Sequence, residues 1–159
     1  MLVGLVILST LLQGQRPPRP QPMVLPLRRI AAVPVEGLPE AGYFLIDSPD
    51  AWRHFLQVYH PDAVPTLPTR LNFNHRVILG VLATASGCKP GPFVHALERR
   101  ADTAQVVVRW LPNQWGPCQM QLHAADLIWL PSPVGPLEFV DEARDGARSK
   151  ISLARVDLR

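Results

Sequence analysis

The chain has 159 residues, of which 47% are hydrophobic, and it carries a formal net charge of +3. This length suits one domain with a sizeable core, and the hydrophobic content excludes a chain that is disordered throughout. The basic residues are scattered and form no dense stripe interleaved with aromatic residues, so we expect no nucleic-acid partner.

Residues 2–12 form an apolar run without a charge, and Gly14 and a stretch rich in proline and arginine follow it. This outline is typical of a secretory signal peptide that is cleaved after Gly14. The run is shorter than the roughly 20 apolar residues of a membrane-spanning helix. No Lys or Arg precedes it, and a buried N-terminal strand or a frayed end is the alternative interpretation. We expect residues 1–14 to be a signal peptide and the protein to be secreted, or to lie in the periplasm or cell envelope.

Residues 15–26 are rich in proline, arginine and glutamine and have little to bury, so they are predicted to be a linker. Residues 27–159 are then a single β-rich domain. Its 18 prolines, counted over the whole chain, interrupt helices and central strands, which favours short elements joined by stiff loops. The first two strands are expected over residues 27–35 and 42–47.

One helix is predicted directly after the second strand. Ser48 can cap its free N–H groups, Pro49 suits its first position, and Asp50 favours its positive end. Apolar side chains then recur at helical spacing on one face: Trp52, Phe55, Leu56 and Tyr59. We expect the helix to end at His60 and Pro61.

The rest of the chain alternates between short apolar runs and turn signals. Residues 76–84 are nearly continuously apolar, which favours a buried central strand. Further strands are expected over residues 93–100, 103–111, 118–123, 127–130, 137–140 and 149–158. The sequence therefore predicts a mainly β (α+β) fold, a single antiparallel β-sandwich or partly open barrel with one packed amphipathic helix.

Several of the predicted elements carry short sequence motifs, and the order of these motifs along the chain is informative. A strand leads into Ser-Pro-Asp-Ala-Trp at residues 48–52, and Asn72-Phe73 and Val-Ile-Leu-Gly-Val at residues 77–81 follow. A Val-Val-Val strand at residues 106–108 precedes Leu-Ile-Trp-Leu-Pro at residues 127–131. Over roughly residues 44–140 the chain resembles the PrcB C-terminal-type domain, a family of small exported bacterial proteins.

The resemblance implies an accessory, non-catalytic role in stabilising or tethering an exported partner, because the family is named after a subunit associated with a surface subtilisin-like protease. Two positions depart from the family pattern. Asn72 stands where the family usually has aspartate, and residues 88–93 replace its Thr-Gly-Gly-Tyr turn. If that turn is the family's contact surface, its partner preference does not extend to this chain.

Cys88 and Cys118 are the only cysteines. In an oxidising compartment such a pair is most simply a disulfide, which would stabilise the fold by roughly 3–4 kcal/mol in the chain-entropy model. Two buried free thiols are the better interpretation in a cytosolic protein. A metal site lacks support, because there is no CxxC motif and no histidine at close spacing.

The bridge would join the turn after Ser86 to the proline-flanked loop at residues 112–117, which together would form one rigid rim. Lys89, Phe93 and Trp115 are the candidate partner-binding residues of this rim. An exposed tryptophan is a natural hot spot for binding protein or sugar, and prolines reduce the entropy lost on docking. The alternative is that Trp115 folds back and caps the core.

The sequence offers little for catalysis. No histidine pair has a recognised metal spacing, no GxSxG or GxGxxG motif occurs, and a Cys88 nucleophile would be incompatible with the disulfide. The acidic residues Glu138, Asp141 and Glu142 suggest a solvated strand end more than a paired-carboxylate site. We therefore expect no catalytic residue, metal or cofactor, and an exported accessory domain that binds an exported protein such as a subtilisin-like protease. The alternatives are a small inhibitor of exported proteases, a carbohydrate-binding or surface-adhesion module, and an enzyme of unknown type.

Overall fold

A computed structural model describes residues 21–59, 67–100, 106–110, 118–142 and 148–158. The chain is mainly β with one helix, as predicted. The elements are β1 (Met23–Leu25), β2 (Arg28–Pro34), β3 (Gly42–Ile46), α1 (Pro49–Val58), β4 (Arg76–Ser86), β5 (Val94–Arg99), β6 (Val106–Trp110), β7 (Gln121–Pro131), β8 (Leu137–Glu142) and β9 (Arg148–Ile151).

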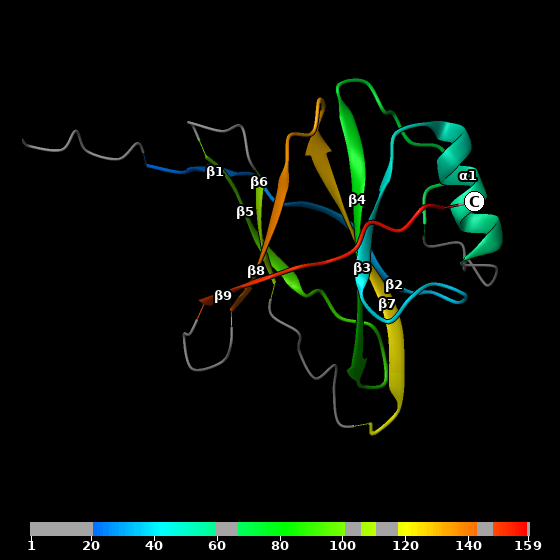
Figure 1. The fold of residues 1–159 in the computed structure, drawn as a ribbon. Coiled ribbons are helices and arrows are strands. Elements are labelled where there is room, and N and C mark those ends of the chain that lie inside the picture. The colour runs from blue at the N-terminus through cyan, green and yellow to red at the C-terminus, as the bar shows by residue number, and fades with distance from the viewer. Residues whose placement is uncertain (1–20, 60–66, 101–105, 111–117, 143–147, 159) are drawn as a thin grey trace, which may run out of the picture.

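The strands form two packed sheets, and α1 adds a third layer (Figure 1). Sheet A has the order β1-β5-β6-β8-β9, and sheet B has the order β2-β7-β4-β3. The helix lies against the face of sheet B that points away from sheet A. The architecture is thus the predicted sandwich, with one difference. β6 and β8 pair in parallel, whereas every other pairing of these strands is antiparallel.

Alternation along the central strand β4 separates two hydrophobic cores. Val77, Leu79 and Val81 face sheet A and pack with residues such as Val108 and Phe139. The intervening side chains face the helix, because successive residues of a strand point to opposite faces. Both faces of sheet B are therefore covered, which explains why residues 76–84 form a nearly continuous apolar run.

The helix begins as predicted. The hydroxyl of Ser48 accepts a hydrogen bond from the backbone N–H of Ala51 at 3.3 Å, and Pro49 occupies the first turn. Trp52 and Phe55 are fully buried against sheet B. The indole N–H of Trp52 donates to the carbonyl of Pro68 at 2.9 Å, so the only polar atom of this buried side chain has a partner.

Gly80 lets the helix-side core close over β4. It pairs with Phe44 of β3, and the Phe44 ring lies against the glycine backbone. A Cβ atom at position 80 would lie 2.1 Å from Cζ of Phe44. The ring therefore occupies the space that a side chain would need.

Two segment predictions are wrong. Residues 118–123 and 127–130 are not separate strands: β7 runs unbroken from Gln121 to Pro131, because β4 pairs with it along its whole length. The linker predicted over residues 15–26 also contains β1. This strand pairs with β5, and its Leu25 is buried in the core between the sheets.

The C-terminal segment crosses from sheet A to sheet B. β9 ends at Ile151, and Tyr43 of β3 then accepts from the N–H of Val156 at 2.7 Å and donates to the carbonyl of Ala154 at 3.0 Å. The strand predicted over residues 149–158 is therefore divided between the two sheets. In the described residues, α1 is too short and too polar to cross a membrane, and no other helix qualifies.

Candidate binding surface

The disulfide predicted from sequence is present. Cys88 and Cys118 are bonded, with their Cα atoms 5.0 Å apart. Next to the bond, the N–H of Gly87 donates to the carbonyl of Met120 at 2.9 Å. These contacts join the segment that leaves β4 to the segment that enters β7. We call residues 87–92 and 118–120 the disulfide rim.

The rim lies at one end of the long β4–β7 pair, beyond Ser86 and Gln121 (Figure 1). Lys89 is exposed there, and Met120 is 64% exposed. Methionine has a flexible, polarisable side chain and is common at adaptable binding surfaces. Met120 was not among the predicted rim residues, although its position two residues after Cys118 could have marked it as one.

The other two predicted rim residues are Phe93 and Trp115. Phe93 is only 1% exposed and packs in the core between the sheets, so the expectation that it faces a partner is wrong. It directly precedes β5, and its ring turns inward as the chain enters sheet A. Trp115 lies outside the described residues.

A buried ion pair anchors the chain where it leaves the rim. Asp126 of β7 is fully buried, and its carboxylate accepts from the backbone N–H groups of Phe93 and Val94 at 3.0 and 2.9 Å. Arg29 of β2 donates to the same carboxylate at 2.7 and 3.2 Å, and it also donates to the carbonyl of Val94. One carboxylate thus joins both sheets and neutralises the arginine that reaches it.

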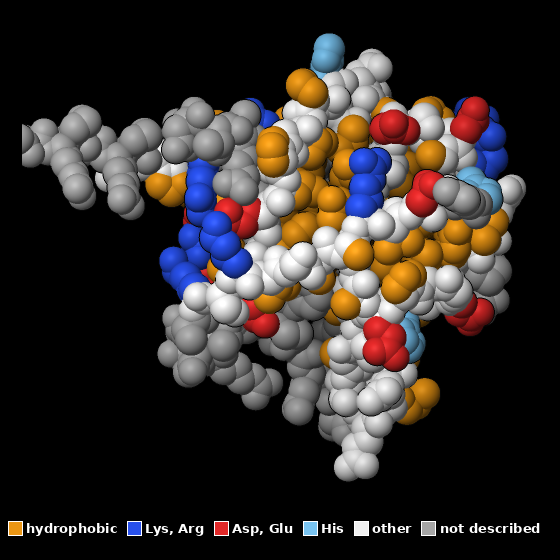
Figure 2. All heavy atoms as spheres, in the orientation of Figure 1, with side chains coloured by type: hydrophobic (Ala, Val, Ile, Leu, Met, Phe, Trp, Pro, Cys, Tyr) orange, Lys and Arg blue, Asp and Glu red, His pale blue; other side chains and the backbone are white. Residues whose placement is uncertain are grey.

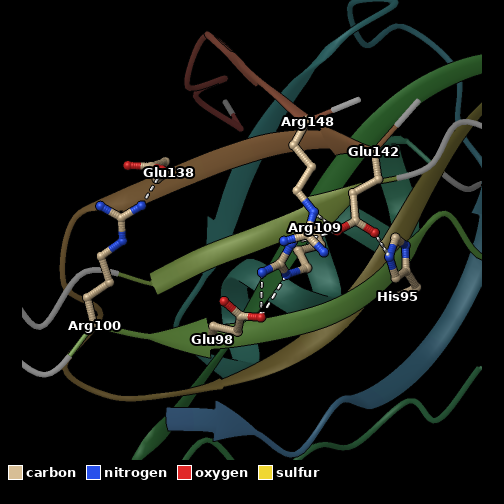
Figure 3. Close-up of polar contacts among 7 residues, drawn as sticks. All are labelled: His95, Glu98, Arg100, Arg109, Glu138, Glu142 and Arg148. Carbon is tan, nitrogen blue, oxygen red and sulfur yellow. Dashed lines mark hydrogen bonds and ion pairs between the residues drawn. The ribbon is translucent and has the colours of Figure 1, made fainter. Parts of the chain in front are cut away.

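The outer face of sheet A carries a second group of charges, drawn in Figure 3. The guanidinium of Arg109 on β6 contacts Glu98 of β5 at 2.7 Å and Glu142 of β8 at 2.6 Å. Glu142 also contacts His95 of β5, and Arg148 of β9 lies 3.3 Å from it. We call these five residues the charged ladder, because they link four neighbouring strands.

The ladder shifts two ionisation equilibria. Burial raises the pKa of the Glu142 carboxyl, but hydrogen bonds and charge from Arg109 and His95 outweigh it, so the pKa lies below its ordinary value. Burial lowers the pKa of Arg109, and its bonds to Glu142 and Glu98 reverse that effect and raise it. Both groups are therefore held in their charged forms.

A neighbouring carboxylate is paired in the same way. Glu138 of β8 contacts Arg100 and Lys150 at 2.9 Å each, and only 9% of its side chain is exposed. The acidic residues near the end of β8 were expected to be a solvated strand end. That expectation is wrong for Glu138 and Glu142, since both carboxylates lie against cationic side chains.

The pKa of Glu142 can be compared with what acid catalysis requires. A general acid needs a carboxyl that stays protonated near neutral pH, which requires a raised pKa. The lowered pKa of Glu142 is opposite to that requirement. The two histidines on strands lie on different sheets. His95 of β5 contacts Glu142 on sheet A, whereas Nδ1 of His123 on β7 of sheet B lies 3.1 Å from the hydroxyl oxygen of Thr84. No group of metal-ligating side chains occurs among the described residues.

The surface divides by chemistry in the view of Figure 2. Lys and Arg side chains gather over sheet A, Asp and Glu side chains are scattered over the whole view, and hydrophobic side chains show between sheet A and the helix. Searches against known family models, curated proteins and solved structures each found no match.

Proposed function

We propose that the protein is an exported, non-catalytic accessory domain that binds an exported protein partner through the disulfide rim. The bonded Cys88–Cys118 pair carries this proposal. Disulfides persist in oxidising compartments, and the apolar run of residues 2–12 is the matching export signal.

The rim has the properties of a contact surface. The disulfide and the Gly87–Met120 hydrogen bond hold its two segments together, so little entropy is lost when a partner docks. Met120 offers exposed apolar area, and the exposed Lys89 adds a charge to the same rim. The resemblance to the PrcB C-terminal-type domain favours a subtilisin-like protease as the partner.

The paired charges of sheet A fit a scaffold better than a catalytic centre. Arg109, Glu142 and Glu138 each contact opposite charges on neighbouring strands, which ties the strands of the sheet together. The accessory role therefore rests on the rim rather than on these carboxylates.

The test is capture from the exported fraction of the producing organism. We expect the tagged protein to recover a protease that remains active, and Met120→Asp to reduce that recovery at least tenfold. Val58→Asp is the matched control, because Val58 is also an exposed apolar residue, at 47%, but lies at the end of α1. Recovery of a protease that has lost its activity would favour the inhibitor alternative. Equal recovery by Met120→Asp and the unaltered protein would contradict a contact through the rim.

A further inference from the structure

A second candidate site lies at the opposite end of the β4–β7 pair from the disulfide rim. A pocket of about 190 Å³ opens where the chain passes from β1 of sheet A into β2 of sheet B. Its apolar wall comes from both sheets and includes Leu25, Leu97 and Leu130. A cavity of about 150 Å³ can hold a benzene molecule, so this pocket has room for one aromatic ring or a short aliphatic chain.

The polar residues that line this pocket are basic. Arg28, His75 and Arg76 line it, and its described lining residues include no aspartate or glutamate. Neither Arg28 nor Arg76 forms an ion pair with a described residue, whereas Arg29, Arg100 and Arg109 all do. The two arginines therefore place positive charge beside an apolar cavity without a described carboxylate to balance it.

Trp129 lies on β7, between the strands that carry the two arginines. Arg28 of β2 pairs with Trp129 across one side of β7, and Arg76 lies on β4, along the other side. The guanidinium carbon of Arg76 lies 5.1 Å from the centre of the Trp129 ring, a cation–π contact. This contact holds Arg76 at the pocket before any ligand arrives, which reduces the entropy lost on binding.

The backbone at the pocket is also unusual. His75 has a φ of 56°, in the left-handed region that non-glycine residues rarely adopt. Its carbonyl accepts from the N–H of Ser132 at 2.9 Å, which ties the turn before β4 to the segment after β7. Such strained positions concentrate at functional sites.

We propose that this pocket binds a carboxylate carried on a single aromatic or short aliphatic group, with the group in the apolar cavity and the carboxylate between Arg28 and Arg76. Arginine suits this task, because its guanidinium matches a carboxylate with two parallel hydrogen bonds. The ligand is either a free small acid or the C-terminus of a peptide with an apolar last residue. The site is independent of the proposed rim contact.

The experiment titrates the full chain with phenylacetate and with the neutral phenylacetamide, and measures binding by calorimetry and by chemical-shift changes. We expect phenylacetate to bind at least tenfold more tightly than phenylacetamide, because only the acid carries the charge that arginine recognises. Equal binding of the two compounds, or no binding of either, would overturn the proposal.

Variants locate the site. Arg76→Gln and Arg28→Gln should each weaken phenylacetate binding about tenfold or more. Arg53→Gln is the matched control, because Arg53 lies on α1 and pairs only with Asp50 among the described residues. Thermal unfolding of each variant separates loss of the site from loss of the fold. Binding weakened equally by Arg53→Gln, or unchanged in Arg28→Gln, which lies on an edge strand, would contradict the assignment.

A third arm identifies the source of the ligand. A short peptide ending in phenylalanine is compared with its C-terminally amidated form. Tighter binding of the free peptide than of phenylacetate would identify a chain terminus as the ligand, and tighter binding of phenylacetate would identify a free small acid. An amidated peptide that binds as well as the free one would overturn carboxylate recognition.

Discussion

The Arg29–Asp126 pair and the charged ladder hold carboxylates in two different surroundings. Asp126 is fully buried between the sheets, and its carboxylate has one cationic partner and two backbone donors. Glu142 lies on the outer face of sheet A with 20% of its side chain exposed, in contact with Arg109, Arg148 and His95. We infer from the comparison that the burial of a charged group, and not the number of its partners, sets how much its loss lowers the free energy of unfolding. The contrast lies in the carboxylates: the Asp126 side chain is fully buried, so water cannot solvate it, whereas the partly exposed Glu142 carboxylate can still be hydrated when a partner is lost.

The largest effect is expected from Asp126→Ala. This change removes the carboxylate to which Arg29 and two backbone N–H groups donate, and it should lower the free energy of unfolding by about 3–5 kcal/mol. Denaturant unfolding of both proteins measures the difference. The double change Arg29→Met with Asp126→Leu is the control, and it should recover the part of the loss that comes from the unpaired arginine, because the N–H groups of Phe93 and Val94 lose their carboxylate acceptor in both variants. A loss below about 1 kcal/mol in Asp126→Ala would mean that the buried pair behaves like a surface pair.

Arg109→Met should have a smaller effect, of about 1–2 kcal/mol. Arg109 holds Glu98 and Glu142 together, and the methionine keeps most of the aliphatic stem over the sheet. Unfolding in low salt and in about 1 M salt sharpens the comparison, since salt screens the partly exposed carboxylates of Glu98 and Glu142 more than the fully buried carboxylate of Asp126. We expect the loss in Arg109→Met to shrink in high salt and the loss in Asp126→Ala to remain. Equal salt dependence of the two variants would contradict the distinction.

The pH dependence of the ladder is set by Glu142. Its pKa is lower in the folded protein than its ordinary value of 4.5, so it stabilises the fold at pH values above about 4.5. That stabilisation disappears as the pH falls through the folded-state pKa, where the carboxyl becomes protonated. Glu142→Gln should therefore be less stable than the unaltered protein at neutral pH and equally stable in strong acid. A stability difference that grows as the pH falls would have the wrong sign.

Lys150→Ala should have the smallest effect, below about 0.5 kcal/mol. The lysine contacts Glu138 at 2.9 Å, but 70% of its side chain is exposed. Exposed pairs of this kind contribute little, because water and salt compensate for the lost partner. Thermal unfolding of Lys150→Ala and of the unaltered protein measures the difference in stability. A change above about 1.5 kcal/mol would indicate that the outer face of sheet A is energetically coupled.

Local patterns were sufficient to predict most of the fold. Ser48 and Pro49 predicted where α1 begins, and the apolar run of residues 76–84 predicted a buried strand, because both signals depend on neighbours in sequence. The predicted break in β7 has an equally local origin. Polar residues such as His123 and Asp126 interrupt its apolar pattern, yet pairing with β4 keeps the strand continuous.

The candidate sites were predicted less completely, because they depend on contacts between distant residues. The disulfide could be predicted, since the chain contains only two cysteines. Arg29 and Asp126 are 97 residues apart, and no spacing rule connects them. The position of Glu142 beside Arg109 depends on the parallel β6–β8 pairing, which the sequence did not indicate. Phe93 looked like part of a turn, although its ring enters the core.

The oxidation state of the cysteines tests the central proposal most directly. The measurement is the intact mass of the protein taken from its producing cells and alkylated under native and denaturing conditions, with and without reductant. We predict a protein of the exported fraction that takes up no alkyl group until it is reduced and then takes up two, at Cys88 and Cys118. Two alkylated cysteines without reductant, in a full-length product inside the cell, would contradict both the disulfide rim and the exported role.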